Sequence, residues 1–418
     1  MESKELKSID LGFSEEQDSW LLTNRFFPSK IGGKAAWLEL ENIPDAKDLS
    51  CDYCNEPCTF LCQIYAAGTG KISHAFHRTI FVFICRNGKC CNINQSGNVK
   101  VLRSQLPLIN KFYPDTPADE SVEIEGIEPF CKVCNVCGCK GPMVCGKCKS
   151  VNYCGQHHQK IDWKSHKRSC GQESISKTNQ IESCHFPEYE IVIEGEDNDT
   201  DTKAKRESDK ESETRRFREY EDMIKEGKIV HNGDISEADM KDMDDTKEDK
   251  AFGKFKKAIE SNPTQVIRYS RHGQPLWISS TGTLNKSNVP KCSNCNGKRS
   301  FEFQIMPQML NDLKNYDLDW GIIAIYTCEN DCNTNGKYIQ EFCYKQDVTK
   351  ADSDAFDVDI KKKLQISEDN CQINSKDEVR SPTTIEGTSK KAKTSKNNKD
   401  IASKVNSKKA FKECDNWE

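Results

Sequence analysis

The sequence has 418 residues, of which 35% are hydrophobic and 30% are charged, and its formal net charge is −5. Because domains commonly contain about 100 to 200 residues, this length predicts about two to four domains. The low hydrophobic content excludes a single large apolar core, so part of the chain must be disordered or stabilised in another way.

The 23 cysteines offer another way, because domains with too little core need disulfides or structural metal ions. The N-terminal residues MESKELKSID lack the apolar region of a secretory signal, and apolar runs such as the one at 322–326 are too short to span a membrane. We therefore expect an intracellular protein without membrane segments, in which paired cysteines bind zinc rather than form disulfides.

The first cysteine-bearing block, residues 8–115, contains two strand-like segments rich in β-branched and aromatic residues, FLCQI from Phe60 and RTIFVFIC ending at Cys85. Cysteines precede the first segment and follow the second, and a turn between the strands would bring these ends together. We expect one zinc ion held by Cys51, Cys54, Cys85 and Cys90, with Cys91 as an alternative to Cys90. The other Cys and His residues of this block are expected to be structural: Cys58, Cys62, His74 and His77.

The second block, residues 131–170, has eight Cys and His residues in four spaced pairs, enough for two four-coordinate zinc sites. The pairs are Cys134-x2-Cys137, Cys145-x2-Cys148, Cys154-x3-His158 and His166-x3-Cys170. This string closely resembles a MYND zinc finger, in which the ligands of two ions interleave. The resemblance implies one ion on Cys134, Cys137, Cys154 and His158, and the other on Cys145, Cys148, His166 and Cys170.

The family spacing leaves Cys131, Cys139 and His157 as bystanders. A zinc ion with four Cys or His ligands has no position for a water molecule, so these sites are expected to be structural and not catalytic. MYND fingers bind short proline-containing peptides, and Gln159 and Trp163 match the family pattern that lines the peptide groove. Packing of Trp163 against the zinc core is an equally good explanation of that residue.

Charge is unevenly distributed after the finger. Residues 188–249 contain 23 Asp and Glu against 11 Lys and Arg, and residues 387–412 contain nine Lys against one Asp. Both stretches are poor in aromatic and β-branched residues, so we expect a disordered acidic linker at 171–249 and a disordered lysine-rich tail at 348–418. Helix-forming residues predict short helices at 212–227 and at 249–263, where Pro263 ends the second.

The third block, residues 250–347, repeats the first at an offset of 240 to 243 residues. Trp37 corresponds to Trp277, Gln63 to Gln304, and the pair at Cys51 to the pair at Cys292. This predicts a second zinc site on Cys292, Cys295, Cys328 and Cys332. The expected fold is a β-rich zinc protein, in which a duplicated zinc-ribbon-like module pairs its N- and C-terminal halves and carries an inserted MYND finger and the acidic linker.

Strings across the chain resemble the programmed cell death protein 2 family, namely SKIGGKAAWLEL, AFHRTIFVFICR, the MYND finger, QVIRYSRHGQPLWIS and DWGIIAIYTC. The resemblance covers about residues 8–170 and 250–347. It implies a non-enzymatic chaperone or adaptor, found in cytoplasm and nucleus, that captures one newly made ribosomal protein of the small (40S) subunit, called S-two.

The residues are compatible with this function, since an acidic linker complements a basic client and exposed strand edges can accept a client strand. The alternative interpretation of the linker is a solvated spacer. The alternative is a MYND-based transcriptional corepressor or chromatin adaptor. The lysine-rich tail lacks interleaved aromatic residues, so sequence-specific binding to nucleic acid is not expected. No glycine-rich cofactor loop, Ser/His/Asp set or open metal site predicts an enzyme.

Overall fold

The computed structural model describes residues 9–67, 72–171, 184–196 and 250–348, all within one unit, Met1–Asp359. The helix expected at 212–227, most of the acidic linker and the tail from residue 349 onward lie outside the described residues. None of the helices in the described part of the chain has the length and apolar content needed to cross a membrane.

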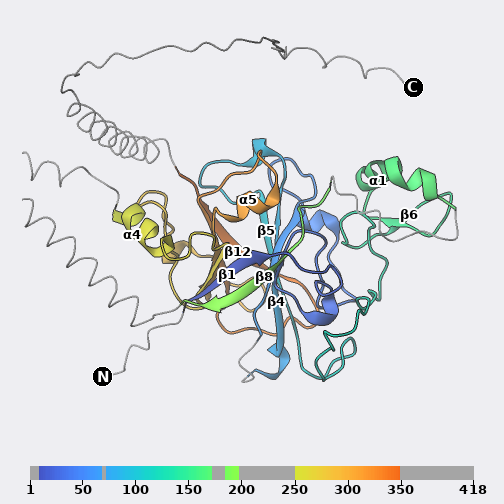
Figure 1. Ribbon diagram of the computed structural model, residues 1–418, viewed down its shortest axis with the longest axis horizontal. Helices are drawn as coiled ribbons and strands as arrows, with labels where there is room; N and C mark the ends of the chain where they lie inside the picture. The colour runs from blue at the N-terminus through green and yellow to red at the C-terminus, as the bar shows by residue number, and fades with distance from the viewer. Residues whose placement is uncertain (1–8, 68–71, 172–183, 197–249, 349–418) are drawn as a thin grey trace, which may run out of the picture. The chain divides into compact units, whose positions relative to one another are not determined.

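The chain is β-rich, as predicted, and its main feature is a closed barrel of antiparallel strands (Figure 1). Around the barrel the order is β1 (Asp10–Glu15), β8 (Tyr189–Gly195), β2 (Lys30–Ile31), β3 (Thr59–Tyr65), β4 (His77–Ile84), β5 (Val99–Leu106), β12 (Ile339–Gln346), β11 (Ile322–Cys328), β10 (Arg299–Ile305) and β9 (Ile267–Tyr269). The expected free strand edges are therefore wrong for the barrel, because each of its strands has a neighbour on both sides.

Short helices and one small sheet complete the described elements. They are η1 (Asn24–Phe26), η2 (Ala46–Leu49), η3 (Ser73–Ala75), η4 (Gly88–Cys90), η5 (Lys286–Asn288), α1 (Gln156–Ser169), α4 (Lys250–Ile259), α5 (Met309–Leu313), and the paired strands β6 (Met143–Val144) and β7 (Asn152–Tyr153). Helix α4 confirms the helix predicted before Pro263. Its Phe255 is buried in an apolar cluster with Leu276 and Ile278.

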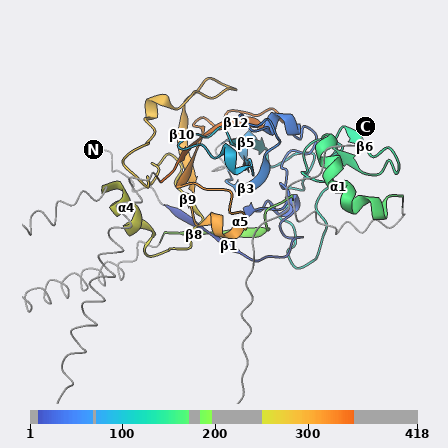
Figure 2. The same cartoon turned by 90° about the horizontal axis from the view of Figure 1, so that it is seen from above.

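Two runs of four consecutive strands form most of the barrel, β2 to β5 from the first block and β9 to β12 from the third. The runs meet where β5 pairs with β12, Arg103 lying opposite Ile339. At the other junction β1 and β8 run side by side (Figure 2), with β1 on β9 and β8 on β2. The strand that precedes each run is therefore added to the opposite run.

Strand β8 corrects the prediction of a disordered linker over 171–249, because residues 189–195 form a strand whose residues 190–195 pair with the whole of β1. The prediction rested on the many Asp and Glu residues of this stretch and overlooked a short β-branched segment, in which Ile191 is buried in the barrel core. Glu196, just after the strand, forms an ion pair with Arg268 at 2.9 Å. Gly12 in β1 permits the close fit, since a Cβ there would lie 2.8 Å from Ile191 Cγ2.

One apolar cluster fills the barrel interior and draws on strands all round it, including Ile80 and Val82 of β4, Phe303 of β10 and Ile325 of β11. Alternate residues of the same strands point outward, as expected for a pleated strand. Phe81 and other outward residues of β4 belong to a second buried cluster with the first block's loops. Both faces of β4 are therefore covered.

The two strand runs share local irregularities. Strand β3 has a register shift between Phe60 and Cys62, and β10 has one between Phe301 and Phe303, at matching positions of the repeat. Such bulges bend a strand and increase its twist, which helps to close a barrel.

A glutamine next to each bulge holds a loop in the same way. Gln63 Oε1 accepts a hydrogen bond from the Ala36 amide at 2.9 Å, and Gln304 Oε1 accepts one from the Leu276 amide at 2.7 Å. Each of these amides belongs to the residue before a repeated tryptophan. Both buried glutamines thereby satisfy a loop amide and fix the position of that tryptophan.

The finger contacts the barrel through its first Cys-x2-Cys turn. Trp37 Nε1 donates to Gly138 O at 2.8 Å, and the Lys140 amide donates to Pro44 O at 3.0 Å. His185, in the segment that leads into β8, hydrogen-bonds to Val136 O. The finger is therefore joined to the run that begins at β2, rather than standing apart from it.

Candidate metal centres

The structure brings the sixteen predicted ligands together as four groups, in each of which the ligand atoms lie within 4.8 Å of one another. The groups are Cys51, Cys54, Cys85 and Cys90 (the N-terminal cluster); Cys134, Cys137, Cys154 and His158 (the first finger cluster); Cys145, Cys148, His166 and Cys170 (the second finger cluster); and Cys292, Cys295, Cys328 and Cys332 (the C-terminal cluster).

The sulfur atoms in these clusters have the spacing of zinc ligands. Neighbouring cysteines of one cluster have Sγ–Sγ distances between 3.5 and 3.9 Å. Two sulfurs bound tetrahedrally to zinc at about 2.3 Å are separated by about 3.8 Å, whereas a disulfide is about 2.0 Å long. The donor sets and their spacing therefore fit zinc.

The N-terminal cluster is built from a tight turn and a strand end. The amide of Asn55, which has a positive φ of 61°, donates to Cys51 O at 2.9 Å, so the chain folds back between the two cysteines of the pair. Cys85 directly follows β4, and Cys90 ends η4. Cys91 lies outside the cluster and accepts a contact from Asn98 Nδ2 at 3.7 Å.

The C-terminal cluster repeats this construction. Asn296 has a φ of 57°, and its amide donates to Cys292 O at 2.8 Å. Cys328 is the last residue of β11, and Cys332 lies in the loop that follows. The two clusters thus use the same backbone turn and the same strand end.

The finger clusters share helix α1, which supplies one histidine to each. His158 Nδ1 lies 3.0 Å from Cys154 Sγ, and His166 Nε2 lies 3.4 Å from Cys148 Sγ. The clusters therefore interleave along the sequence, which is the arrangement that the resemblance implies. The predicted bystanders lie outside all four clusters: Cys131, Cys139 and His157.

A buried ion pair adjoins the C-terminal cluster. Arg103 Nε binds Glu341 Oε1 at 2.6 Å, and both side chains are fully buried. The other oxygen of Glu341 accepts from Arg299 Nε at 2.6 Å, while Oε1 also accepts from the Cys328 amide at 3.2 Å. Arg103 donates to Cys332 as well, to its Sγ at 3.3 Å and to its carbonyl oxygen at 3.1 Å.

These donors affect the acidity of Cys332. Burial alone would raise the pKa of this thiol, but hydrogen bonds from Asn294 and Arg103, together with the positive charge of Arg103, lower it to about 7. A thiol that favours the thiolate is suited to a metal ligand.

A second ion pair joins the two strand runs nearby. Arg78 of β4 binds both carboxylate oxygens of Glu302 of β10, and its Nε lies 2.9 Å from Asp331 Oδ1. Burial raises the pKa of Glu302, but the positive charge of Arg78 and its hydrogen bonds outweigh that effect and lower the pKa to about 2. Glu302 is therefore ionised at neutral pH and holds Arg78 in place.

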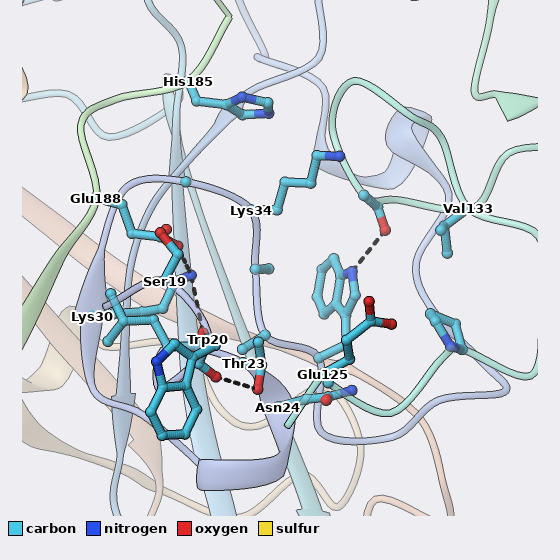
Figure 3. A pocket seen from close by; sticks show the side chains of 18 of the residues that line it. Ser19, Trp20, Thr23, Asn24, Lys30, Lys34, Glu125, Val133, His185 and Glu188 are labelled. Atoms are coloured by element: carbon cyan, nitrogen blue, oxygen red, sulfur yellow. Dashed lines mark hydrogen bonds and ion pairs between the residues drawn. The ribbon is translucent and has the colours of Figure 1, made fainter. Parts of the chain in front are cut away.

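A cleft of about 990 Å³ lies where the barrel, the finger and the segment before β8 meet (Figure 3). Trp20, Lys34 and Glu188 line it, and the Lys34 side chain extends into it. Burial and the charge of Lys34 lower the pKa of His185 to about 4, so this imidazole is neutral and its Nε2–H donates to Val136 O. No member of the four clusters lines the cleft.

Comparison with known proteins identifies the family. Models for the N-terminal and C-terminal domains of programmed cell death protein 2 match residues 8–120 and 249–347, and the MYND finger model matches residues 131–170. Programmed cell death protein 2 of Mus musculus is 38% identical over 356 residues, which are 82% of this chain and 97% of the mouse protein. The chain belongs to the programmed cell death protein 2 family.

Further proteins are similar to this programmed cell death protein 2 family member over most of its length or over part of it. The Bos taurus protein of that name is 38% identical over 368 residues, covering 84% of this chain and all of the bovine protein. A Schizosaccharomyces pombe protein named "Probable 20S rRNA accumulation protein 4" is 38% identical over 95 residues, 20% of this chain and 24% of the yeast protein. No solved structure matches the chain.

The residues that match the MYND peptide groove lie on α1, four positions apart. Trp163 is 44% exposed, and its ring lies edge-on 5.9 Å from that of His166. Packing beside a cluster and exposure to solvent therefore occur together at this residue. Neither Gln159 nor Trp163 lines the cleft described above.

Sequence reasoning missed the buried ion pairs in this member of the programmed cell death protein 2 family. A signal was present, because Arg103 follows Val99 and Val101 at alternate positions of one strand, on the face that carries apolar core residues. A charged residue on a buried strand face needs a charged partner. The sequence does not identify that partner, Glu341, which lies 238 residues away.

Proposed function

We propose that this chain is a non-enzymatic chaperone or adaptor that binds a newly made ribosomal protein of the small subunit and supports assembly of that subunit. Membership of the programmed cell death protein 2 family carries the proposal, since the family resemblance implies this client. The name of the Schizosaccharomyces pombe relative, which refers to accumulation of 20S rRNA, also points to ribosome biogenesis. Such a role would place the protein in both cytoplasm and nucleus.

Four structural zinc ions are part of the proposal, one in each cluster. Each cluster offers four Cys or His atoms, which fill a tetrahedral coordination shell and leave no open position for a water molecule or substrate. In this arrangement zinc holds loops and strand ends together and performs no chemistry. We expect elemental analysis of the purified chain to give four zinc ions; two or fewer would contradict it.

We also propose that the barrel arose from one zinc-ribbon-like module present twice. The matching bulges, the two glutamines and the two Cys-x2-Cys turns with a left-handed asparagine support this interpretation. The reciprocal placement of β1 and β8 supports it as well, because each strand precedes one run and completes the other.

Co-purification tests the client. The full chain is expressed in cells, captured by an affinity tag, and its partners are identified by mass spectrometry. We expect a single small-subunit ribosomal protein in near-equal amount. A matched variant, Trp163→Ala, should retain this client, because Trp163 lies on the finger surface rather than in the barrel. Loss of the ribosomal protein from the wild-type capture, or from the Trp163→Ala capture alone, would contradict the proposal.

A MYND-based corepressor or chromatin adaptor is the second candidate. The exposure of Trp163 favours it, together with exposed Met143 and Val144 of β6 in the same finger. Such a surface suits a proline-containing peptide. In the same capture experiment, recovery of nuclear regulatory proteins that Trp163→Ala abolishes, without any ribosomal protein, would favour this second function.

The acidic linker remains a prediction, since most of it lies outside the described residues. A run of negative charge would raise the association rate with a basic client. Salt would weaken this attraction, because at physiological ionic strength charges separated by more than about 8 Å are largely screened. Neutralising Asp242, Asp244, Asp245, Glu248 and Asp249 is therefore expected to lower the association rate and its salt dependence in stopped-flow measurements.

A further inference from the structure

Arg103 occupies an unusual position, at the junction of the two strand runs and against the C-terminal cluster. It lies on β5, opposite Ile339 of β12, so it belongs to the seam between the runs. Its guanidinium donates through Nε to Glu341, and through the two terminal nitrogens to Cys332 Sγ and Cys332 O. One buried side chain therefore contacts both a strand of the opposite run and a cluster thiol.

Glu341 extends the connection to a second cluster residue. Its Oε1 accepts from the Cys328 amide at 3.2 Å as well as from Arg103. The Arg103–Glu341 pair thus positions Cys328 through its backbone and Cys332 through its sulfur and carbonyl. These two residues form the half of the cluster at the end of β11 and in the loop after it, whereas Cys292 and Cys295 come from the turn before β10.

The negative charge of a zinc-loaded cluster and the positive charge of Arg103 stabilise each other. A zinc ion with four thiolates carries two more negative charges than positive ones, and a buried anion of this kind is stabilised by a nearby cation and N–H donors. Arg103 in turn is fully buried, and it shares Glu341 with Arg299. Without the charge of the loaded cluster, two buried arginines would share a single carboxylate.

The matching position of the other run differs. Arg103 of β5 lies opposite Ile80 of β4, and Lys345 of β12 lies opposite Ile323 of β11, the residue that corresponds to Ile80, so Lys345 is the match of Arg103. Lys345 is also a buried cation, but its ammonium group donates to both carboxylate oxygens of Asp347, at 2.9 and 2.8 Å. The matching cations therefore have different partners, a cluster thiol and Glu341 for Arg103 and a neighbouring carboxylate for Lys345.

We infer that Arg103 is an outer-sphere partner of the C-terminal zinc site, and that it makes zinc binding there and pairing of β5 with β12 dependent on each other. The inference rests on the zinc ligation proposed above. Residues that hydrogen-bond to metal ligands commonly alter metal affinity by about 10- to 100-fold. Coupling of two sites is reciprocal, so zinc at this cluster also stabilises the seam.

Chelator competition on the full-length protein tests the first half of the inference. Wild type, Arg103→Met and Arg299→Met are titrated with a zinc chelator, and released cysteines are alkylated and assigned by mass spectrometry. Arg299→Met is the matched control, because Arg299 binds the same carboxylate through Nε while its terminal nitrogens donate to backbone carbonyl oxygens. We expect Arg103→Met to lower zinc affinity about 10- to 100-fold at Cys328 and Cys332, with Cys85 and Cys90 unchanged.

Hydrogen exchange tests the reciprocal half. Removing zinc from the C-terminal cluster by Cys332→Ser should raise amide exchange in β5 and β12, while Cys148→Ser in the second finger cluster should leave both strands as in wild type. Arg103→Lys, which keeps the charge but loses the fork of donors, should give an intermediate zinc affinity.

The outcomes separate this inference from the zinc proposal. If wild type shows no protected cysteines at the C-terminal cluster, zinc ligation itself is wrong. If wild type is loaded but Arg103→Met keeps wild-type affinity, or loses metal equally at all four clusters, the role of Arg103 is wrong. Should Arg103→Met not fold, Arg103→Lys decides, since wild-type affinity in that variant also overturns the inference.

Discussion

The two strand runs of the barrel place a tryptophan at the same point and cover it differently. Trp37 is 4% exposed, packs against Phe81 and Phe83, and donates to Gly138 of the finger. Trp277 is only half-buried and meets Tyr344 edge-on at 5.9 Å. The cluster around it includes helix α4 instead of a zinc finger. The same loop, held by a buried glutamine, therefore places a tryptophan against a zinc finger in one run and against helix α4 in the other. The elements packed on the barrel can differ while the barrel strands stay the same.

The residues in the two bulges also differ, because one is apolar and the other is charged. Leu61 in the bulge of β3 is fully buried and belongs to the barrel core. Glu302, at the matching position of β10, is equally buried but binds Arg78. The N-terminal run is therefore closed by apolar packing, whereas the C-terminal run relies on ion pairs that reach back to the first run.

The largest effect is expected from losing a cluster ligand. Cys292→Ser should remove one zinc ion and unfold the barrel around the C-terminal cluster, because structural zinc contributes on the order of 10 kcal/mol to folding. Circular dichroism and elemental analysis measure both. The matched control is Cys91→Ser, since Cys91 lies beside a cluster but outside it. A folded Cys292→Ser protein that still binds four zinc ions would show that the C-terminal cluster does not need Cys292 as a zinc ligand, and would contradict the prediction.

Removing charge at Glu302 should be the next largest effect. Glu302→Gln leaves Arg78 with less compensation, and breaking a buried pair commonly costs about 3 to 5 kcal/mol. Chemical denaturation at pH 7 measures the loss. Leu61→Ala probes the corresponding apolar position, where truncation of a buried leucine costs about 2 to 5 kcal/mol.

The pH dependence distinguishes these two variants. The pKa of Glu302 is lowered from an ordinary value of 4.5 to about 2 in the folded state. Its contribution to stability is therefore complete above about pH 4.5 and is lost as the pH falls toward 2. Glu302→Gln should flatten the stability profile in that window, whereas Leu61→Ala should keep the wild-type slope. Equal slopes in all three proteins would contradict the ionised Glu302.

The tryptophan pair tests a more local difference between the two runs. Trp37→Ala should destabilise by about 3 to 5 kcal/mol, as for a buried tryptophan, and should release the first finger turn. Trp277→Ala should cost less, because Trp277 is partly exposed. Hydrogen exchange at residues 134–141 provides the measurement, and rapid exchange there in Trp277→Ala but not in Trp37→Ala would reverse our assignment.

The smallest effect on stability is expected at the finger surface. Trp163→Ala should change the free energy of unfolding by less than about 1 kcal/mol, because the ring is 44% exposed. Thermal unfolding of the isolated full-length protein measures this. A loss as large as that for Trp37→Ala would mean that Trp163 stabilises the finger core and is not available to a peptide.

Local patterns in the sequence were enough to predict the four clusters. A Cys-x2-Cys turn is encoded within a few residues, and the spacing on α1 places His158 and His166 two turns apart on one helix. The same patterns gave the β-rich character and the family. They could not predict the closed barrel, because β1 pairs with β8 and β9, which lie far away in the sequence and are not indicated by any local pattern.

The remaining errors also come from long-range pairing. Composition over 62 residues concealed Ile191, whose burial depends on strands made far earlier and later in the chain. Arg103 and Glu341 are each ordinary charged residues in sequence, and only the pairing of β5 with β12 makes them partners. Long-range pairs of this kind need an additional source of information, such as a structure.

The position of β1 has a consequence for synthesis on the ribosome. Its partner β9 begins at Ile267, about 250 residues after β1 ends at Glu15, and at about 5 to 20 residues per second translation of that interval takes about 10 to 50 seconds. During this time β1 has no β9 to pair with, and the N-terminal run keeps an open seam. Completion of the barrel is therefore tied to the emergence of its last quarter from the exit tunnel.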